Sequence, residues 1–346
     1  MVKWLILSWF IVLSVSAAQC GPQPLSLQDL RQDVPPGEPN LPIPKGHAVS
    51  QSPNLHPVPL EAGEKLKVAA TTNIIGDIAR QVGGEAIDLT LLLPLGADPH
   101  TFTPSPRDVA AVAEARVVFI NGLGLEAFLA ELIANAGGEA VVVPVSQGVE
   151  TRALEEDEGH EPDEAADHDH GEVDPHAWLS PANGLIFVRN IEAALAALDP
   201  ANAAAYKANA EAYRAKLEEL DAWVQAQIET IPAENRKLVT DHNEFGYYAD
   251  RYGLELVGAI IPAYSTAAEP SAQELAELQT AMRAVGVKAV FVGTTVNPKL
   301  AEQVARDSGV KLAFLYTGSL GEVGSGVETY LDLIRYNTRA IVEALK

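Results

Sequence analysis

Apolar and polar positions follow two kinds of period along this chain, and the two kinds alternate. Between residues 66 and 146, short runs rich in β-branched residues are each followed by a longer stretch with helical spacing of its apolar positions. Strands that alternate with helices indicate a parallel sheet with helices on both faces. The pattern predicts strands at 67–71, 87–93, 116–120 and 140–143, and helices at 75–82, 106–115 and 125–136.

Two long helical stretches separate this block from a second one of the same kind. They cover 181–198 and 201–229, and the second is rich in Ala, Glu, Lys and Leu. At a rise of about 1.5 Å per residue it would be about 40 Å long, which is enough to join two lobes. After it, the alternation predicts strands at 238–240, 254–261, 289–292 and 312–316, and helices at 244–252, 271–285, 298–308 and 327–345.

The predicted fold class is therefore α/β with two lobes, each a mostly parallel sheet flanked by helices. The N-terminal lobe covers 66–200, the bridging helix 201–230 and the C-terminal lobe 231–346. Ligands of open α/β sheets bind beyond the carboxyl ends of the strands. We therefore expect the functional site in the cleft between the lobes.

The first twenty residues are typical of an exported protein. Lys3 precedes an apolar stretch, 4–15, and small residues follow it, which is the layout of a signal peptide covering 1–19. The apolar stretch is shorter than the roughly 20 residues that span a bilayer. Cys20 is the only cysteine, so an internal disulfide is excluded. It resembles the lipid-modified cysteine of bacterial lipoproteins, although Gln19 replaces the usual small residue; ordinary cleavage and release is the alternative.

Composition adds a spacer and excludes one class of partner. Ten of the 23 prolines lie between residues 21 and 60, so 20–65 is expected to be an extended spacer between a lipidated N-terminus and the folded lobes. The net charge of −23 argues against nucleic-acid binding, which needs basic surfaces. Residues 150–173, here called the acidic loop, are rich in Asp and Glu and are expected to be solvated.

The eight histidines divide into three groups. His47 and His56 lie in the spacer, and the acidic loop carries His160, His168 and His170. Those three are candidates for weak ion collection, and the alternative is a loop without measurable affinity. The remaining three are the only histidines in the segments expected to fold: His100, His176 and His242.

These three histidines are the candidate metal ligands, because imidazole is the commonest metal ligand in proteins. His100 and His242 each follow a predicted strand, one in each lobe, so the inter-lobe cleft would bring them together. An Asp lies one or two residues before each histidine. Metal-bound imidazole usually donates its second nitrogen to a carboxylate or carbonyl, so these residues either orient the rings or form plain turns: Asp98, Asp174 and Asp241.

Six segments, in order, resemble the metal-binding lipoproteins of bacterial ABC importers for zinc and manganese (cluster A-I). This resemblance implies two α/β lobes joined by one long helix. It also implies that His100, His176 and His242 are the first three ligands. The segments are 70–78, 96–101, 104–108, 174–181, 241–247 and 315–321.

The chain departs from this family at the fourth ligand. That ligand is usually an Asp within Tyr-Thr-x-Ser-Leu-Gly, where this chain has Gly318. Manganese members carry carboxylates at the third and fourth positions, and manganese favours oxygen ligands. Three imidazoles with one open position suit zinc, which is typically four-coordinate. We expect a water as the fourth ligand, or else a nearby carboxylate, such as Glu322 or one in the acidic loop.

The resemblance implies a monomeric, extracytoplasmic protein that captures Zn²⁺ and delivers it to an ABC permease and its ATPase. A manganese-binding member of the same family is the alternative. A zinc-dependent hydrolase is a further one, since three histidines and an open position also describe catalytic zinc. Glu244 would then be the general base, or else a surface residue opening a helix. No H-E-x-x-H motif is present, and an aromatic content of 6% disfavours a binder of haem or cobalamin. We expect no enzymatic activity.

Overall fold

The computed structural model describes residues 55–152 and 173–346. The predicted signal peptide, Cys20, most of the spacer and the acidic-loop histidines His160, His168 and His170 lie outside the described residues. Within the described ranges, no helix is both long and apolar enough to cross a bilayer.

The N-terminal lobe is built on a four-stranded parallel sheet with the order β2-β1-β3-β4. The two central strands, β1 and β3, are almost wholly buried. This agrees with their runs of Val, Ala and Phe. The strands are β1 (Leu66–Ala70), β2 (Ile87–Leu91), β3 (Val117–Ile120) and β4 (Val141–Pro144), and the helices are α1 (Asn73–Gly83), α2 (Pro106–Glu114) and α3 (Leu129–Ala136).

The C-terminal lobe repeats this arrangement with the order β6-β5-β7-β8, again all parallel. In both lobes the first strand lies between the second and the third, so the first and third strands are central. The strands are β5 (Lys237–His242), β6 (Glu255–Ile261), β7 (Ala289–Gly293) and β8 (Lys311–Leu315), and the helices are α6 (Gly246–Tyr252), α7 (Ala272–Val285) and α8 (Lys299–Ser308).

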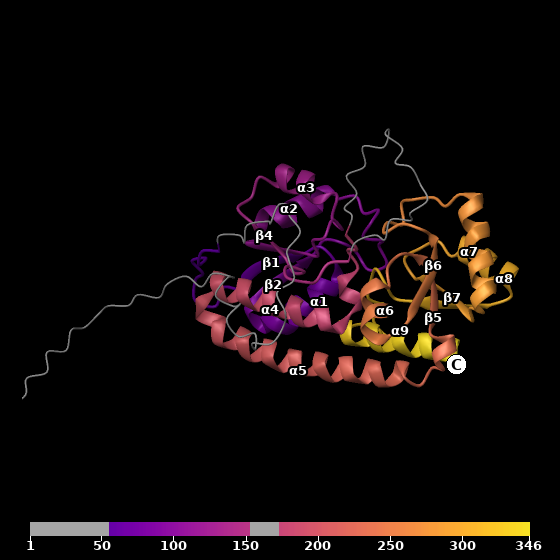
Figure 1. The fold of residues 1–346 in the computed structure, drawn as a ribbon. Helices are drawn as coiled ribbons and strands as arrows, with labels where there is room; N and C mark the ends of the chain where they lie inside the picture. Colours follow the sequence, from indigo (N-terminus) through magenta and orange to yellow (C-terminus); the bar gives the residue numbers. More distant parts are fainter. Residues whose placement is uncertain (1–54, 153–172) are drawn as a thin grey trace, which may run out of the picture.

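Three long helices pack along one side of the molecule: α4 (Pro181–Leu198), α5 (Ala203–Ile228) and α9 (Tyr330–Leu345). Figure 1 shows α5 running beneath both lobes, and it packs on α1 and α4 at one end and on α9 and α6 at the other. Apolar residues of α5 recur every three or four positions and form one buried stripe, as an amphipathic helix requires. That stripe consists of Tyr206, Ala210, Tyr213, Leu217, Leu220, Val224 and Ile228.

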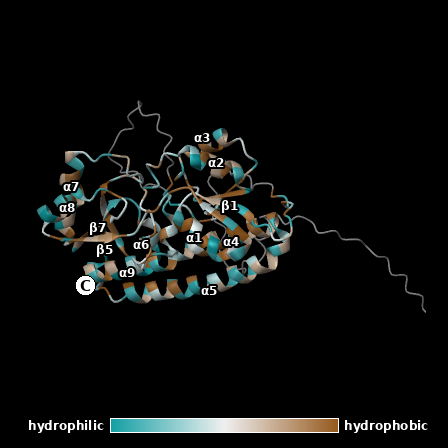
Figure 2. Cartoon of the chain, turned by 180° about the vertical axis from the view of Figure 1, so that it is seen from behind, coloured by the Kyte–Doolittle hydropathy of each residue, from teal (hydrophilic) through white to brown (hydrophobic). Residues whose placement is uncertain are grey.

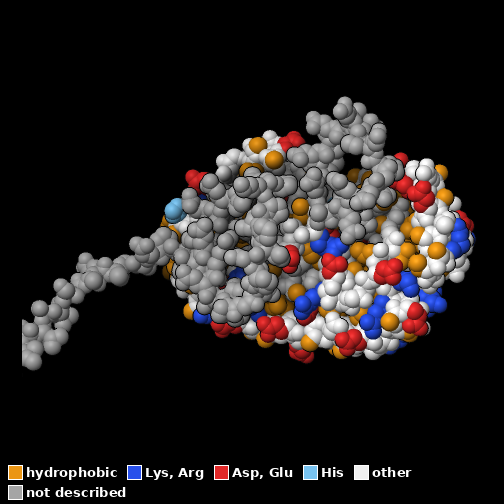
Figure 3. All heavy atoms as spheres, viewed as in Figure 1, with side chains coloured by type: hydrophobic (Ala, Val, Ile, Leu, Met, Phe, Trp, Pro, Cys, Tyr) orange, Lys and Arg blue, Asp and Glu red, His pale blue; other side chains and the backbone are white. Residues whose placement is uncertain are grey.

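The buried stripe of α5 belongs to a core that is continuous between the lobes. One cluster of buried side chains includes Val68 of β1, Leu217 of α5 and Phe291 of β7. Figure 2 shows hydrophobic strands in the interior, and Figure 3 shows acidic and basic side chains interspersed over the outer surface. Because apolar packing is shared, the two lobes are held as one body on the α5 side.

The two-lobed α/β prediction is confirmed, and each predicted strand and helix has its counterpart. Several boundaries differ from the prediction. The helix expected from 125 starts at Leu129, and the one expected from 327 starts at Tyr330, where the side chain of Thr329 accepts from the backbone N–H of Asp332. The strand expected to end at 240 continues to His242, and the helix expected from 244 starts at Gly246.

Candidate metal site

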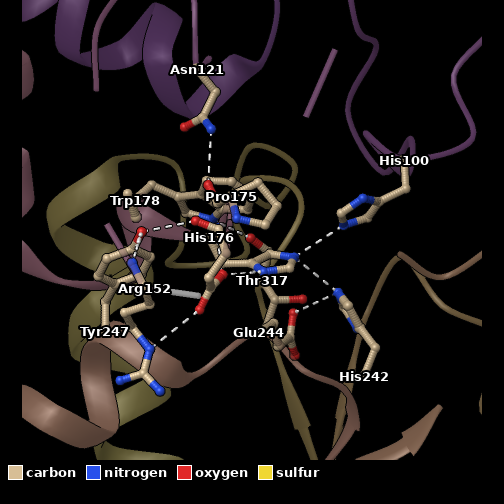
Figure 4. Close-up of polar contacts among 12 residues, drawn as sticks. His100, Asn121, Arg152, Pro175, His176, Trp178, His242, Glu244, Tyr247 and Thr317 are labelled. Atoms are coloured by element: carbon tan, nitrogen blue, oxygen red, sulfur yellow. Dashed lines mark hydrogen bonds and ion pairs between the residues drawn. The ribbon is translucent and has the colours of Figure 1, made fainter. Parts of the chain in front are cut away.

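The three histidines predicted from the sequence converge in the cleft between the lobes (Figure 4). The Nε2 atom of His176 lies 3.1 Å from Nε2 of His100 and 3.2 Å from Nε2 of His242. Ring nitrogens of all three lie within 4.8 Å of one another. His176 and His242 are buried and His100 is half-buried. The structure therefore brings together imidazoles from both lobes.

The same tripeptide, Asp-Pro-His, positions the two histidines of the N-terminal lobe. The Oδ1 atom of Asp98 accepts from the backbone N–H of His100, and that of Asp174 accepts from the backbone N–H of His176, both at 2.9 Å. Asp side chains favour such turns, and the intervening proline fixes its own φ. Both histidines are thus presented by short, stiff turns.

His242 is positioned by the sheet of the C-terminal lobe. It is the last residue of β5, and the Oδ1 atom of Asp241 accepts from its backbone N–H at 2.6 Å. The other oxygen of Asp241 accepts from the backbone N–H of Gly293, at the end of β7, at 2.6 Å. Asp241 therefore ties together the carboxyl ends of two neighbouring strands.

Two of the three aspartates also orient the imidazole rings. Oδ1 of Asp174 lies 2.9 Å from Nδ1 of His176, and Oδ1 of Asp241 lies 2.6 Å from Nδ1 of His242. A carboxylate accepts the Nδ1 proton, so Nε2 of each neutral ring keeps its lone pair for a metal ion. Asp98 does not contact the ring of His100; its Oδ2 accepts from the hydroxyl of Thr266 at 2.5 Å.

Glu244 is the residue at this site whose role the sequence did not indicate. Its side chain is 2% exposed, and Oε2 lies 3.6 Å from Nε2 of His242. The interpretation of Glu244 as a surface residue opening a helix is wrong, because α6 begins two residues later and the carboxylate faces the cleft. An acidic residue just before the apolar sequence Phe245-Gly246-Tyr247 was the available signal.

The histidines and Glu244 line a cavity of about 10 Å³, which is room for about one water-sized sphere. Glu322, the carboxylate expected to supply a fourth ligand, is exposed and is not among the lining residues. Gly318 does line the cavity. The other lining residues are Asp98, Pro99, Trp178, Thr266, Thr295 and Thr317.

Burial and charge give the histidines of the two lobes opposite pKa shifts. Burial, together with the neighbouring His242, lowers the pKa of His100 to about 4. Burial also holds the pKa of His176 well below its usual range. Burial acts the same way on His242, but the carboxylates of Glu244 and Asp241 outweigh it and raise the pKa of His242 to about 9. Burial raises the pKa of Glu244 well above its usual range.

The ring of His176 has a further support outside the cavity. Burial raises the pKa of Asp174 to about 7, against the opposing effects of the His176 backbone N–H and of Arg152. The Nε atom of Arg152 lies 3.8 Å from Oδ2 of Asp174, and its guanidinium also pairs with Asp250 of α6. Arg152 thus links the partner of His176 to the C-terminal lobe.

Polar contacts between the lobes surround the cavity. The indole N–H of Trp178 donates to the carbonyl oxygen of Thr317 at 2.7 Å. Asn73 donates to the hydroxyl of Ser319 at 3.0 Å, and its Oδ1 accepts from the backbone N–H of Leu320 at 2.8 Å. The segment 315–321 therefore docks against the N-terminal lobe.

Comparison with known proteins places this chain in a family. Residues 68–344 match the family described as zinc-uptake complex component A, periplasmic (ZnuA). The chain belongs to this family. It is thus a metal-binding solute-binding protein of the ABC-importer class, and the resemblance seen in the six sequence segments is confirmed.

Individual relatives cover most of the chain. It is 37% identical over 286 residues to the manganese-binding lipoprotein MntA of Halalkalibacterium halodurans, covering 82% of this chain and 90% of the relative. It is 34% identical to the manganese ABC transporter substrate-binding lipoprotein PsaA of Streptococcus mitis, with the same coverage. The solved periplasmic zinc-binding protein TroA of Treponema pallidum superposes with a TM-score of 0.72 at 28% identity, covering 82% of this chain and 99% of that one.

Proposed function

We propose that this protein captures Zn²⁺ outside the cytoplasm and delivers it to an ABC permease driven by its ATPase. The observation that carries the proposal is the convergence of three imidazoles, His100, His176 and His242, whose ring nitrogens lie within 4.8 Å of one another. Because Nδ1 of His176 faces Asp174 and Nδ1 of His242 faces Asp241, their Nε2 atoms are the ones directed at a shared cation.

The spacing of the ring nitrogens fits zinc. For Zn–N bonds of about 2.0–2.1 Å, two ligands of a tetrahedral ion lie about 3.3 Å apart. The two Nε2–Nε2 separations that involve His176, 3.1 and 3.2 Å, are close to that edge. Zinc also binds nitrogen-rich sites more tightly than manganese, which stands at the weak end of the affinity order for divalent first-row ions.

Manganese is the second candidate, and the relatives favour it. Two proteins that are 37% and 34% identical to this chain are named for manganese. The carboxylate of Glu244 beside His242 would add the hard oxygen ligand that manganese prefers. Against manganese stands the third histidine, where the manganese members of the family carry a carboxylate.

The setting of the site completes the proposal. Cys20 anchors the protein to the outer face of the cell membrane, and residues 20–65 hold the lobes, as a monomer, away from the surface. The acidic-loop histidines bind a further ion weakly. No catalysis is proposed, since the family consists of transport proteins. Because the acidic-loop histidines bind their ion only weakly, replacing His160, His168 and His170 should remove weak metal binding and leave tight metal binding unchanged.

Competitive calorimetry with zinc and with manganese tests the proposal. We expect one tight zinc site, and His100→Ala, His176→Ala and His242→Ala should each weaken it by at least about 100-fold, since loss of outer-sphere partners alone costs about 10–100-fold. His56→Ala, in the exposed part of the spacer, is the matched control. Undiminished affinity in the His176 variant, or manganese binding tighter than zinc, would contradict it.

A further inference from the structure

Gly318 lines the cavity without a side chain, and the space beside it is taken. A Cβ atom added to Gly318 would lie 2.9 Å from Cδ of Pro99 and 2.9 Å from the hydroxyl of Thr295. Pro99 belongs to the turn that presents His100, so a side chain at 318 would displace a ligand-bearing turn. The glycine is therefore matched to the close approach of the two lobes.

A carboxylate reaches the cavity from another direction. Glu244 follows the end of β5, whereas Gly318 follows the end of β8. Its side chain is 2% exposed, and its ion pair within the described residues is with His242. Burying a carboxylate is costly unless a cation or several hydrogen bonds compensate. The Thr317 hydroxyl supplies one such hydrogen bond, and the nearby Asp241 adds negative charge to the same space.

The carboxylate of Glu244 lies beside one of the three imidazoles, that of His242. Oε2 lies 3.6 Å from Nε2 of His242, close to the edge of about 3.3 Å expected between two ligands of tetrahedral zinc. The Nε2 atom of His242 thus has two neighbours, Nε2 of His176 and Oε2 of Glu244. Three imidazoles and one carboxylate leave no need for Glu322.

We propose that Glu244 is the fourth ligand of an ion held by His100, His176 and His242. The inference rests on the proposed function. It changes the expected site from three imidazoles with a vacancy to three imidazoles with a carboxylate. Such a donor set also gives a hard ion one oxygen ligand, which agrees with manganese as the weaker-bound second cargo.

The first test compares Glu244→Gln with wild type, using Glu322→Gln, an exposed carboxylate in the same region, as the control. Glutamine keeps the size of the side chain and an acceptor for Thr317 but is a poor ligand. We expect zinc affinity to fall at least about 10-fold in Glu244→Gln and to stay unchanged in Glu322→Gln. The visible spectrum of the Co²⁺-loaded protein should change only in the Glu244 variant. Wild-type affinity and spectrum in Glu244→Gln would overturn the inference.

A second measurement does not depend on any variant folding. In a crystal structure of the zinc-loaded wild-type protein, an oxygen of Glu244 should lie about 2.0–2.2 Å from the ion. Zinc held by the three histidines and a water, with Glu244 outside bonding distance, would overturn the inference and leave the proposed function standing. A wild-type protein without tight zinc or manganese binding would instead overturn the proposed function.

Discussion

The two lobes share one strand order but prepare their metal-binding side chains differently. The N-terminal lobe offers His100 and His176, whose pKa values burial holds low, to about 4 for His100. The C-terminal lobe offers His242, whose pKa the carboxylates of Glu244 and Asp241 raise to about 9. The sheet topology brings strand ends together, and the side chains placed there decide the chemistry.

This difference assigns the lobes separate tasks. At neutral pH the two imidazoles of the N-terminal lobe are uncharged and ready to donate to a cation. The His242–Glu244 pair holds a proton that a metal ion must displace, because metal ligands bind in their deprotonated forms. We therefore expect capture of the ion to release a proton from the C-terminal lobe.

Proton release should give the largest effect. Because His242 binds a proton up to about pH 9, zinc affinity should rise with pH throughout the range below that value. If one proton is displaced, zinc affinity should rise about tenfold per pH unit, or about 100-fold between pH 6 and pH 8. Calorimetry in two buffers of different ionisation enthalpy measures the protons released. Affinity independent of pH in this range would remove the distinction between the lobes.

The aspartates that orient the rings should give the next largest effect. Asp174→Asn and Asp241→Asn each allow an amide N–H to face Nδ1, which would leave the proton on Nε2 and block that ligand. We expect each change to lower zinc affinity about 10–100-fold. Asp307→Asn, on the exposed end of α8, serves as the control. Equal affinity in all three variants would show that ring orientation does not depend on these carboxylates.

Replacing Arg152 should have the smallest effect on zinc affinity, because it acts only through the pKa of Asp174. Removing the guanidinium in Arg152→Ala should raise that pKa further above about 7, so that more of Asp174 is protonated at pH 7. Zinc affinity should then fall roughly threefold to tenfold at pH 7 and recover near pH 9, since one pKa unit corresponds to about tenfold. Arg306→Ala, exposed on α8, is the control. A loss that persists at pH 9 would indicate a structural role for Arg152 instead.

Most of the fold followed from local patterns in the sequence. The alternation of strands and helices predicted both sheets, and the apolar stripe from Tyr206 to Ile228 predicted the helix that joins them. The convergence of His100 and His242 was predictable because both follow strands of parallel sheets. Ring orientation by Asp174 and Asp241 was left open, because adjacency in sequence does not determine which atom a carboxylate faces.

The fourth position could not be predicted, because it depends on contacts between distant segments. Gly318 suggested a vacant ligand position. In the structure, Pro99 of the other lobe lies close beside Gly318. Glu244 stands where the sequence predicted the start of a helix, and the end of β5 at His242 instead directs it into the cleft. Glu322, chosen for its nearness in sequence to Gly318, lies on the exposed surface.

X-ray absorption at the zinc edge of the loaded protein counts the imidazole ligands, because scattering from imidazole rings is distinctive. We expect three imidazoles with Zn–N distances of about 2.0–2.1 Å in the wild-type protein. We expect two in His176→Ala loaded at high zinc concentration. Zinc surrounded by oxygen atoms alone, or an unchanged spectrum in His176→Ala, would contradict a metal site built from His100, His176 and His242.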